Sequence, residues 1–129
     1  MKESCELKAI FNTSPKALYE AWLIGEEHAE MTGGDATGSA KEGTEFTAWD
    51  GYIWGTNKTL TPHSKIIQAW RTAEFAENDD DSIVEISLTE VDGGTELTIT
   101  HTNIPEGQTQ YEQGWVDHYI DPMTAFFND

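Results

Sequence analysis

Hydrophobic and polar positions alternate with a period of two along several stretches of this chain. In the first stretch, Cys5, Leu7, Ala9 and Phe11 share one mostly apolar face. Because neighbouring side chains of a strand point to opposite faces, this alternation predicts a β-strand. Similar patterns predict five more strands, over residues 44–49, 52–60, 64–73, 83–91 and 95–104. The short connections between these ranges favour an antiparallel sheet.

Two short helices are predicted directly after the first strand. Ser14 is suited to cap the first helix, and Pro15 is suited to its first turn. Gly25 is a natural end for that helix. Residues 26–31 favour a second helix, which ends at Thr32-Gly33-Gly34.

A long helix is predicted over residues 106–127. Large side chains recur there at helical spacing, at Tyr111, Trp115, His118/Tyr119 and Met123. Pro122 should kink this helix, because its missing N–H leaves the carbonyl of His118 without its usual partner. One strand, two short helices, a run of strands and a final helix together indicate an α+β fold.

Residues 44–60 form a predicted hairpin crowded with aromatic side chains. Asp50-Gly51 favours a two-residue turn, because both residues tolerate positive φ angles. In that register Trp49 pairs with Tyr52, and Thr47 pairs with Trp54, so these four residues share one face. The other face carries Phe46, Ala48, Ile53 and Gly55. The period of two does not decide which face lines a cavity, and both alternatives stay open.

Length and charge limit the classes of function. A chain of 129 residues is expected to form a single domain, residues 1–129. Its 24 acidic and 7 basic residues give a formal net charge of -17. Such a surface repels phosphate backbones and anionic lipids, so we expect no nucleic-acid partner and no membrane association.

The cysteine content and the apolar runs bear on location. Cys5 is the only cysteine, which excludes an internal disulfide and is compatible with a reducing compartment. The N-terminal residues lack the apolar core of a signal peptide, and the longest wholly apolar run is Ala21–Ile24. We therefore expect a cytoplasmic protein.

Several motifs, in this order, resemble one known family. They are Leu18-Tyr19-Glu20-Ala21-Trp22, Thr32-Gly33-Gly34, Gly43-Thr44-Glu45-Phe46, Trp49-Asp50-Gly51-Tyr52-Ile53-Trp54-Gly55, Ile67-Gln68-Ala69-Trp70-Arg71, Gly94-Thr95-Glu96-Leu97 and Gly114-Trp115. The chain resembles the START-like (SRPBCC) helix-grip superfamily over nearly its whole length. Within it, the chain is similar to the family named after the activator of heat-shock protein 90 ATPase. Members of that family often carry Trp where this chain has Met31.

The resemblance implies a helix-grip fold, in which a curved antiparallel sheet wraps around a long C-terminal helix. It also implies an apolar cavity between the sheet and that helix. Related families bind lipids or hydrophobic metabolites, or cyclise polyketides. The resemblance therefore implies a small hydrophobic ligand, and a chaperone is a second possible partner.

Strand parity and helical spacing select candidate cavity residues. Trp70 and Gln68 lie opposite Arg71, which most simply faces water and pairs with a carboxylate. Gln68 then needs a hydrogen-bond partner on an apolar wall, and that partner is a ligand, the protein or water. Candidates on the C-terminal helix are Trp115, Tyr119 and Met123, with the Tyr119 hydroxyl as a polar handle.

His101 shares a strand face with Leu97 and Ile99, so we expect it to point inward. A histidine satisfied within the core is the more common role. A ligand contact or an acid/base role stays open, because histidine titrates near neutral pH. The four histidines are scattered without metal-ligand spacing, and we expect no metal, no cofactor and no catalytic constellation.

Three functional hypotheses follow. The favoured one is a protein that binds a small hydrophobic ligand between the sheet and the C-terminal helix. The alternatives are a chaperone-associated interaction protein and a polyketide-cyclase-like enzyme, with His101 or Tyr119 as acid/base. An exposed aromatic face at Trp49 and Trp54 would make a homodimer possible.

Overall fold

The computed structural model describes residues 2–128 and contains one six-stranded antiparallel sheet in the order β1-β6-β5-β4-β3-β2. Neighbours along the chain are neighbours in the sheet, except that β1 pairs with β6. The strands are β1 (Glu3–Phe11), β2 (Glu45–Ala48), β3 (Ile53–Thr61), β4 (Lys65–Thr72), β5 (Ser82–Val91) and β6 (Gly94–Ile104).

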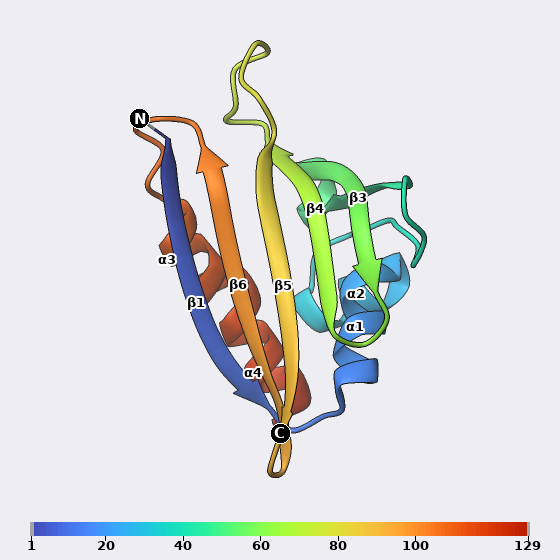
Figure 1. Ribbon diagram of the computed structural model, residues 1–129. Coiled ribbons are helices and arrows are strands. Elements are labelled where there is room, and N and C mark those ends of the chain that lie inside the picture. Colours follow the sequence, from blue (N-terminus) through green and yellow to red (C-terminus); the bar gives the residue numbers. More distant parts are fainter. Residues whose placement is uncertain (1, 129) are drawn as a thin grey trace.

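Helices cover one face of the curved sheet (Figure 1). The pair α1 and α2 lies beside the helix formed by α3, η2 and α4, which we call the C-terminal helix. The helical elements are α1 (Pro15–Leu23), α2 (Gly25–Thr32), α3 (Tyr111–Trp115), η2 (Val116–Ile120) and α4 (Asp121–Phe127). This arrangement confirms the α+β helix-grip fold.

As predicted from the alternation of its residues, β1 buries one face and exposes the other. Phe11 is completely buried, and Cys5, Leu7 and Ala9 pack against the core, while the residues between them are exposed. The core lies between the sheet and the helices. Its fully buried side chains include Leu18, Ile66, Ile86, Leu97, Ile99 and Met123.

The two short helices begin and end near the predicted positions. The Ser14 side chain accepts a hydrogen bond from the Ala17 backbone N–H at 3.1 Å, which caps α1. Gly25 does not end a helix outright but opens α2, directly after the Ile24 cap. Gly33 ends α2 with φ of 92°, a left-handed conformation that favours glycine.

The C-terminal helix begins at Tyr111, so the predicted start at residue 106 was wrong. Pro105 and Gly107 form a turn instead, in which the Gln108 N–H bonds the Pro105 carbonyl at 3.1 Å. The Gly107 backbone has φ of 86° and its N–H donates to the Glu3 carboxylate. These local bonds delay the helix by about one turn.

Before Pro122 the C-terminal helix contains a π-helical segment, η2, while the kink expected at Pro122 stays a prediction. The Asp121 N–H donates to the Val116 carbonyl, five residues earlier. Pro122 then lies in the first turn of α4, where its missing N–H costs little. π-Helical segments occur frequently at functional sites.

The hairpin of β2 and β3 has the predicted register but a different turn. Thr47 pairs with Trp54, and the strands end at Ala48 and Ile53. The connection therefore has four residues, 49–52, and includes the short helix η1 (Trp49–Gly51) rather than a two-residue turn. Phe46, Ala48 and Ile53 are buried on the inner face, and Trp54 is exposed on the outer face.

Trp49 leaves the strand at this connection, so the prediction that it shares an exposed face with Trp54 was wrong. Trp49 packs instead against the core side of the sheet. The aromatic surface proposed for a homodimer is reduced accordingly, and a homodimer stays a prediction.

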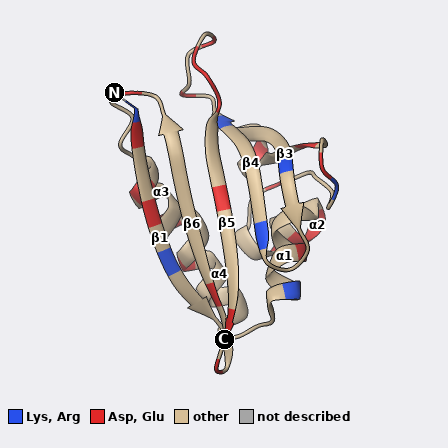
Figure 2. Ribbon diagram, viewed as in Figure 1, with Lys and Arg blue, Asp and Glu red and all other residues tan. Residues whose placement is uncertain are grey.

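Acidic residues are spread over the strands and loops, with few basic residues among them (Figure 2). The β4–β5 loop is rich in them. In residues 2–128, we find no helix with the length and apolar character needed to span a membrane.

Candidate functional site

A pocket of about 550 Å³ lies between the C-terminal helix and the β2–β3 connection. Its walls are mainly apolar. Six aromatic side chains form much of the lining: Trp49, Tyr52, Trp70, Tyr111, Trp115 and Tyr119. Their rings come from η1 and the adjoining residue, from β4 and from the C-terminal helix, and we call this site the aromatic pocket.

Smaller and polar residues complete the lining: Ile53, Gln110, Gln113, Gly114, Asp117 and His118. Gly114 leaves space open on the helix, because a Cβ built there meets no atom within 4 Å. A larger residue at position 114 would therefore project into free space at the aromatic pocket.

Trp49 forms one wall of the aromatic pocket. Its ring lies 5.2 Å, centroid to centroid, from the ring of His118, in an edge-on arrangement. On another side the ring approaches Gly34, where an added Cβ would lie only 2.5 Å from Cε3 of Trp49. The absence of a side chain at Gly34 therefore makes room for the Trp49 ring.

The backbone that carries Trp49 is strained. Trp49 and Asp50 have φ of 49° and 60°, values that non-glycine residues rarely adopt. The segment is held by the Asp50 N–H, which donates to the Asp35 carbonyl, and by the Asp50 carboxylate, which accepts from the Asp35 N–H. Backbone strain of this kind is often found at ligand clamps and switch regions.

The indole N–H of Trp49 is buried and has no hydrogen-bond partner among residues 2–128. A buried donor without an acceptor costs about 1–3 kcal/mol. The wall of the aromatic pocket therefore carries an unsatisfied polar group.

The structure brings three of the six predicted cavity residues to this pocket. Trp70, Trp115 and Tyr119 line it. Gln68, His101 and Met123 are buried but do not line it. Met31, where members of the resembled family often carry Trp, is also buried in the core and is not part of the lining.

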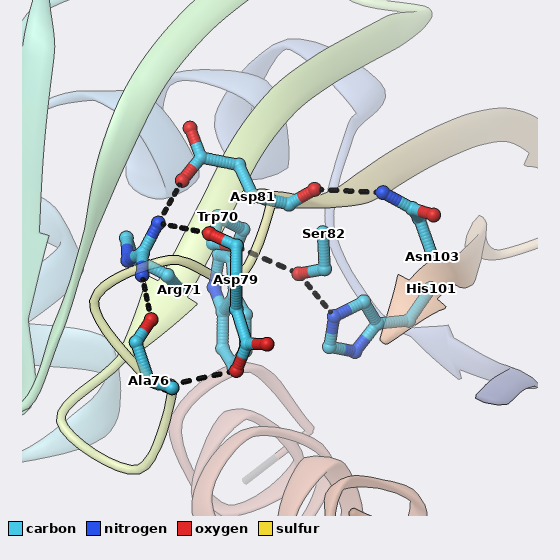
Figure 3. Close-up of polar contacts among 8 residues, drawn as sticks. All are labelled: Trp70, Arg71, Ala76, Asp79, Asp81, Ser82, His101 and Asn103. Atoms are coloured by element: carbon cyan, nitrogen blue, oxygen red, sulfur yellow. Dashed lines mark hydrogen bonds and ion pairs between the residues drawn. The ribbon is translucent and has the colours of Figure 1, made fainter. Parts of the chain in front are cut away.

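His101 is completely buried and both of its ring nitrogens are hydrogen-bonded. Nδ1 accepts from the Trp115 indole N–H at 3.1 Å, so Nε2 carries the proton of the neutral ring. Nε2 donates to the Ser82 hydroxyl at 2.8 Å, and that hydroxyl donates to the Trp70 carbonyl (Figure 3). Burial lowers the pKa of His101 to about 3. These bonds agree with a histidine satisfied within the core.

Gln68 also finds its partners within the protein. Its Oε1 accepts from the Trp22 indole N–H at 3.2 Å, and its Nε2 donates to Oδ1 of Asn57 at 2.9 Å. The Asn57 amide group in turn donates to the backbone carbonyls of Ser39 and Lys41. This network ties β3 and β4 to α1 and to the α2–β2 connection, and it gives both amide atoms of Gln68 a partner within the protein.

Tyr119 is buried, and its hydroxyl lies 2.8 Å from Nε2 of His28. Nδ1 of His28 lies 2.8 Å from the Trp22 carbonyl and must donate to it, so Nε2 accepts from Tyr119. Burial lowers the pKa of His28 to about 4, although the Trp22 bond opposes this shift. Burial raises the pKa of Tyr119. The Tyr119 ring lines the pocket, but its hydroxyl is engaged away from any ligand.

These environments bear on acid/base chemistry. At neutral pH His101 and His28 are neutral and Tyr119 keeps its proton, which places the titrations of all three far from pH 7. Burial and the nearby Glu112 carboxylate raise the pKa of the Cys5 thiol to about 11. Among the described residues, no group of three or more potential ligands is placed to hold a metal ion.

The β4–β5 loop is fixed beside the core by Arg71. The guanidinium group pairs with the Asp81 carboxylate at 2.7 Å and donates to the carbonyls of Asp79 and Ala76 (Figure 3). This confirms that Arg71 faces outward and pairs with a carboxylate. The loop also carries Phe75, whose ring packs against Trp70 and Tyr111, two residues of the aromatic pocket.

Sequence reasoning did not select several residues that the structure places at or near the pocket. Trp49 and Tyr52 belong to the aromatic hairpin, but the two-residue turn assigned them to a strand face. His28 was considered only as a metal ligand, and it proved to be the partner of Tyr119. No local pattern predicts that pairing, because 91 residues separate the two.

Comparisons with known proteins agree with this architecture. The family model described as "Activator of Hsp90 ATPase homolog 1-like protein" matches residues 12–128. The activator of 90 kDa heat shock protein ATPase homolog of Dictyostelium discoideum is 33% identical in an alignment of 129 positions, which covers 98% of this chain and 33% of that protein. Homolog 1 of Homo sapiens is 32% identical over 94% of this chain and 36% of its own length. The chain thus spans about a third of these curated relatives.

A solved structure has a similar fold over nearly its whole length. The Plasmodium falciparum protein described as an HSP90 activator has a TM-score of 0.86 and 25% sequence identity to this chain. The match covers 95% of this chain and 94% of that chain.

Proposed function

The chain belongs to the family of activator of Hsp90 ATPase homolog 1-like proteins, and within that family we propose that it binds a small apolar molecule in the aromatic pocket. One observation carries this proposal: a pocket of about 550 Å³ with a mainly apolar lining opens beside the C-terminal helix. Ligand sites are typically concave, largely apolar and of about 300–1,000 Å³.

The polar groups around the pocket support a binding role rather than catalysis. The hydroxyl of Tyr119 and the ring of His101 are held by protein partners, and both titrate far from neutral pH. The pocket walls therefore contribute aromatic area and shape. An acid/base role for either residue, as in a polyketide-cyclase-like enzyme, gains no support from this geometry.

Native mass spectrometry of the freshly purified protein tests the proposal. We expect a discrete mass above that of the chain, which disappears under denaturing conditions. Gly114→Phe should remove this additional mass, because its side chain would project into the pocket. Gly114→Ala is the matched control, since a methyl group there meets open space and should leave the ligand bound. Equal retention of the ligand by both variants would place its site elsewhere.

A second function is supported by the curated relatives. Proteins of Dictyostelium discoideum and Homo sapiens that are 33% and 32% identical to this chain carry the name of activators of the 90 kDa heat shock protein ATPase. We propose as the alternative that this chain acts as an interaction module for such a chaperone. The chain aligns with about a third of each of these relatives.

The ATPase rate of a purified heat-shock protein 90, measured with and without this chain, tests the alternative. Stimulation that persists in Gly114→Phe would support a chaperone role independent of the pocket. No stimulation and no association at equimolar concentration would contradict the chaperone role and leave the ligand-binding proposal unaffected.

A further inference from the structure

Several polar groups in the wall of the aromatic pocket are already engaged within the protein. The Tyr111 hydroxyl donates to Oε1 of Gln108 and accepts from the Thr72 hydroxyl, each at 2.8 Å. The Tyr119 hydroxyl donates to His28, and the Trp115 indole N–H donates to His101. None of these donors is free to meet a ligand without breaking a bond inside the protein.

Two indole N–H groups in the same wall differ from these. The indole N–H of Trp49 is buried without a partner, and that of Trp70 makes no hydrogen bond within residues 2–128. Both side chains line the pocket. Because an indole N–H only donates, an acceptor is the one type of group that can satisfy it. In contrast, the indole groups of Trp22 and Trp115 have acceptors in Gln68 and His101.

The charges around the pocket restrict the acceptor. Asp117 lines the pocket, and no lysine or arginine is among the lining residues that the structure describes. The chain as a whole carries a formal net charge of -17. A carboxylate or phosphate would enter this field without a lysine or arginine in the lining to compensate its charge, so a neutral acceptor is favoured.

We infer that the ligand class of the aromatic pocket is an uncharged aromatic carbonyl compound, whose oxygen accepts from the indole N–H of Trp49, of Trp70 or of both. This inference rests on the proposed ligand-binding function. The rings of the pocket provide stacking and edge contacts for an aromatic ligand. Because the Trp49 N–H is buried, its ring must turn to present this donor to a ligand.

Matched ligands test the inference. 1-Tetralone and tetralin share their ring system, and only the ketone carries an acceptor; 1,2,3,4-tetrahydro-1-naphthoate adds a negative charge. Their dissociation constants are measured by displacement of the neutral fluorescent dye N-phenyl-1-naphthylamine. We expect 1-tetralone to bind about threefold to tenfold more tightly than tetralin, as one net hydrogen bond provides. The carboxylate should bind more weakly than the ketone.

The indole N–H resonances identify the donor. In a 1H–15N spectrum, 1-tetralone should shift the Trp49 or the Trp70 indole proton downfield relative to the tetralin complex, while the indole proton of Trp22, which does not line the pocket, serves as the internal reference. Trp49→Phe and Trp70→Phe each remove one donor. At least one of them should reduce the ratio of ketone to hydrocarbon affinity, and Trp54→Phe, an exposed position outside the pocket, should preserve it.

The outcomes separate the two claims. Tetralin binding as tightly as 1-tetralone, or an affinity ratio unchanged in both pocket variants, would overturn the carbonyl inference while the ligand-binding function stands. If neither compound displaces the dye or shifts any pocket resonance, the inference and the proposed function both fail.

Discussion

The hydroxyl of Tyr119 donates to Nε2 of His28 across 2.8 Å, and this bond joins the π-helical segment of the C-terminal helix to α2. The His28 ring then donates to the Trp22 carbonyl at the end of α1. Three helical segments are therefore connected through one buried imidazole. The same contact turns the only polar atom of the Tyr119 side chain away from a ligand.

Tyr119→Phe tests whether this hydroxyl is structural. The substitution leaves Nε2 of His28 buried without a donor, so we expect a loss of about 1–3 kcal/mol in the free energy of unfolding. Urea denaturation measures it. Tyr52→Phe is the matched control, because the Tyr52 side chain is 40% exposed. A large loss of ligand affinity without a loss of stability would instead support the Tyr119 hydroxyl as a ligand contact.

Stability should fall as the pH decreases below about 6.5. In the folded protein, burial lowers the pKa of His28 to about 4 and that of His101 to about 3, whereas an unfolded histidine titrates near 6.5. The unfolded chain therefore binds more protons in this interval. The stabilisation is complete above pH 6.5 and is lost progressively as the pH falls toward the folded pKa values.

Each of these histidines should contribute about 2 kcal/mol of destabilisation between pH 7 and pH 5. Urea denaturation at pH 7, 6 and 5 measures this dependence. His28→Gln and His101→Gln should each reduce the slope, because glutamine does not titrate. A wild-type slope that both variants reproduce would show that other groups cause the pH dependence.

Gly34 and Gly114 make a matched pair of glycine positions beside the pocket. Gly34→Ala places a Cβ within 2.5 Å of the Trp49 ring and should displace it, with a cost of about 1–3 kcal/mol. Gly114→Ala meets open space on a helix and should be neutral or stabilising by up to about 1 kcal/mol. Thermal denaturation and near-UV circular dichroism compare them. If the two substitutions change the stability equally, the Trp49 ring does not need the space that Gly34 leaves.

Arg71→Lys should loosen the β4–β5 loop. The planar guanidinium group of Arg71 reaches Asp81, Asp79 and Ala76 with two nitrogen atoms. The single ammonium group of a lysine cannot keep all three contacts. We expect faster amide hydrogen exchange over residues 73–81, and a change below about 1 kcal/mol in global stability. Lys65→Arg, at an exposed position of the same strand, is the control. Unchanged exchange in the loop would show that backbone bonds alone order it.

Local patterns predicted those parts of the fold that local chemistry determines. Alternation along β1 and the cap at Ser14 need only neighbouring residues, and both predictions were confirmed. The start of the C-terminal helix was wrong because the Gly107 N–H bonds Glu3, far away in the sequence. The turn at 49–52 was wrong because Asp50 is held by Asp35 through bonds that sequence periodicity does not contain.

In the candidate site too, local patterns predicted burial but did not predict contacts between residues far apart in the sequence. Parity placed Trp70, Gln68 and His101 on the inner face, and all three are buried. Parity does not reveal which of them reaches the pocket, because Gln68 and His101 are enclosed by their partners Trp22, Asn57, Ser82 and Trp115. Trp49 lines the pocket from η1, a connection that the predicted two-residue turn did not contain.

The central claim is that the aromatic pocket binds an apolar ligand, and a titration with N-phenyl-1-naphthylamine tests it most directly. The dye is titrated into the wild-type protein, Gly114→Ala and Gly114→Phe, and its fluorescence reports occupancy. We expect saturable binding with similar dissociation constants for wild type and Gly114→Ala. Gly114→Phe should bind the dye at least tenfold more weakly, since filling the pocket costs more than about 1.4 kcal/mol of binding free energy. Equal binding by all three proteins, or no saturable binding by the wild type, would contradict a ligand site in the aromatic pocket.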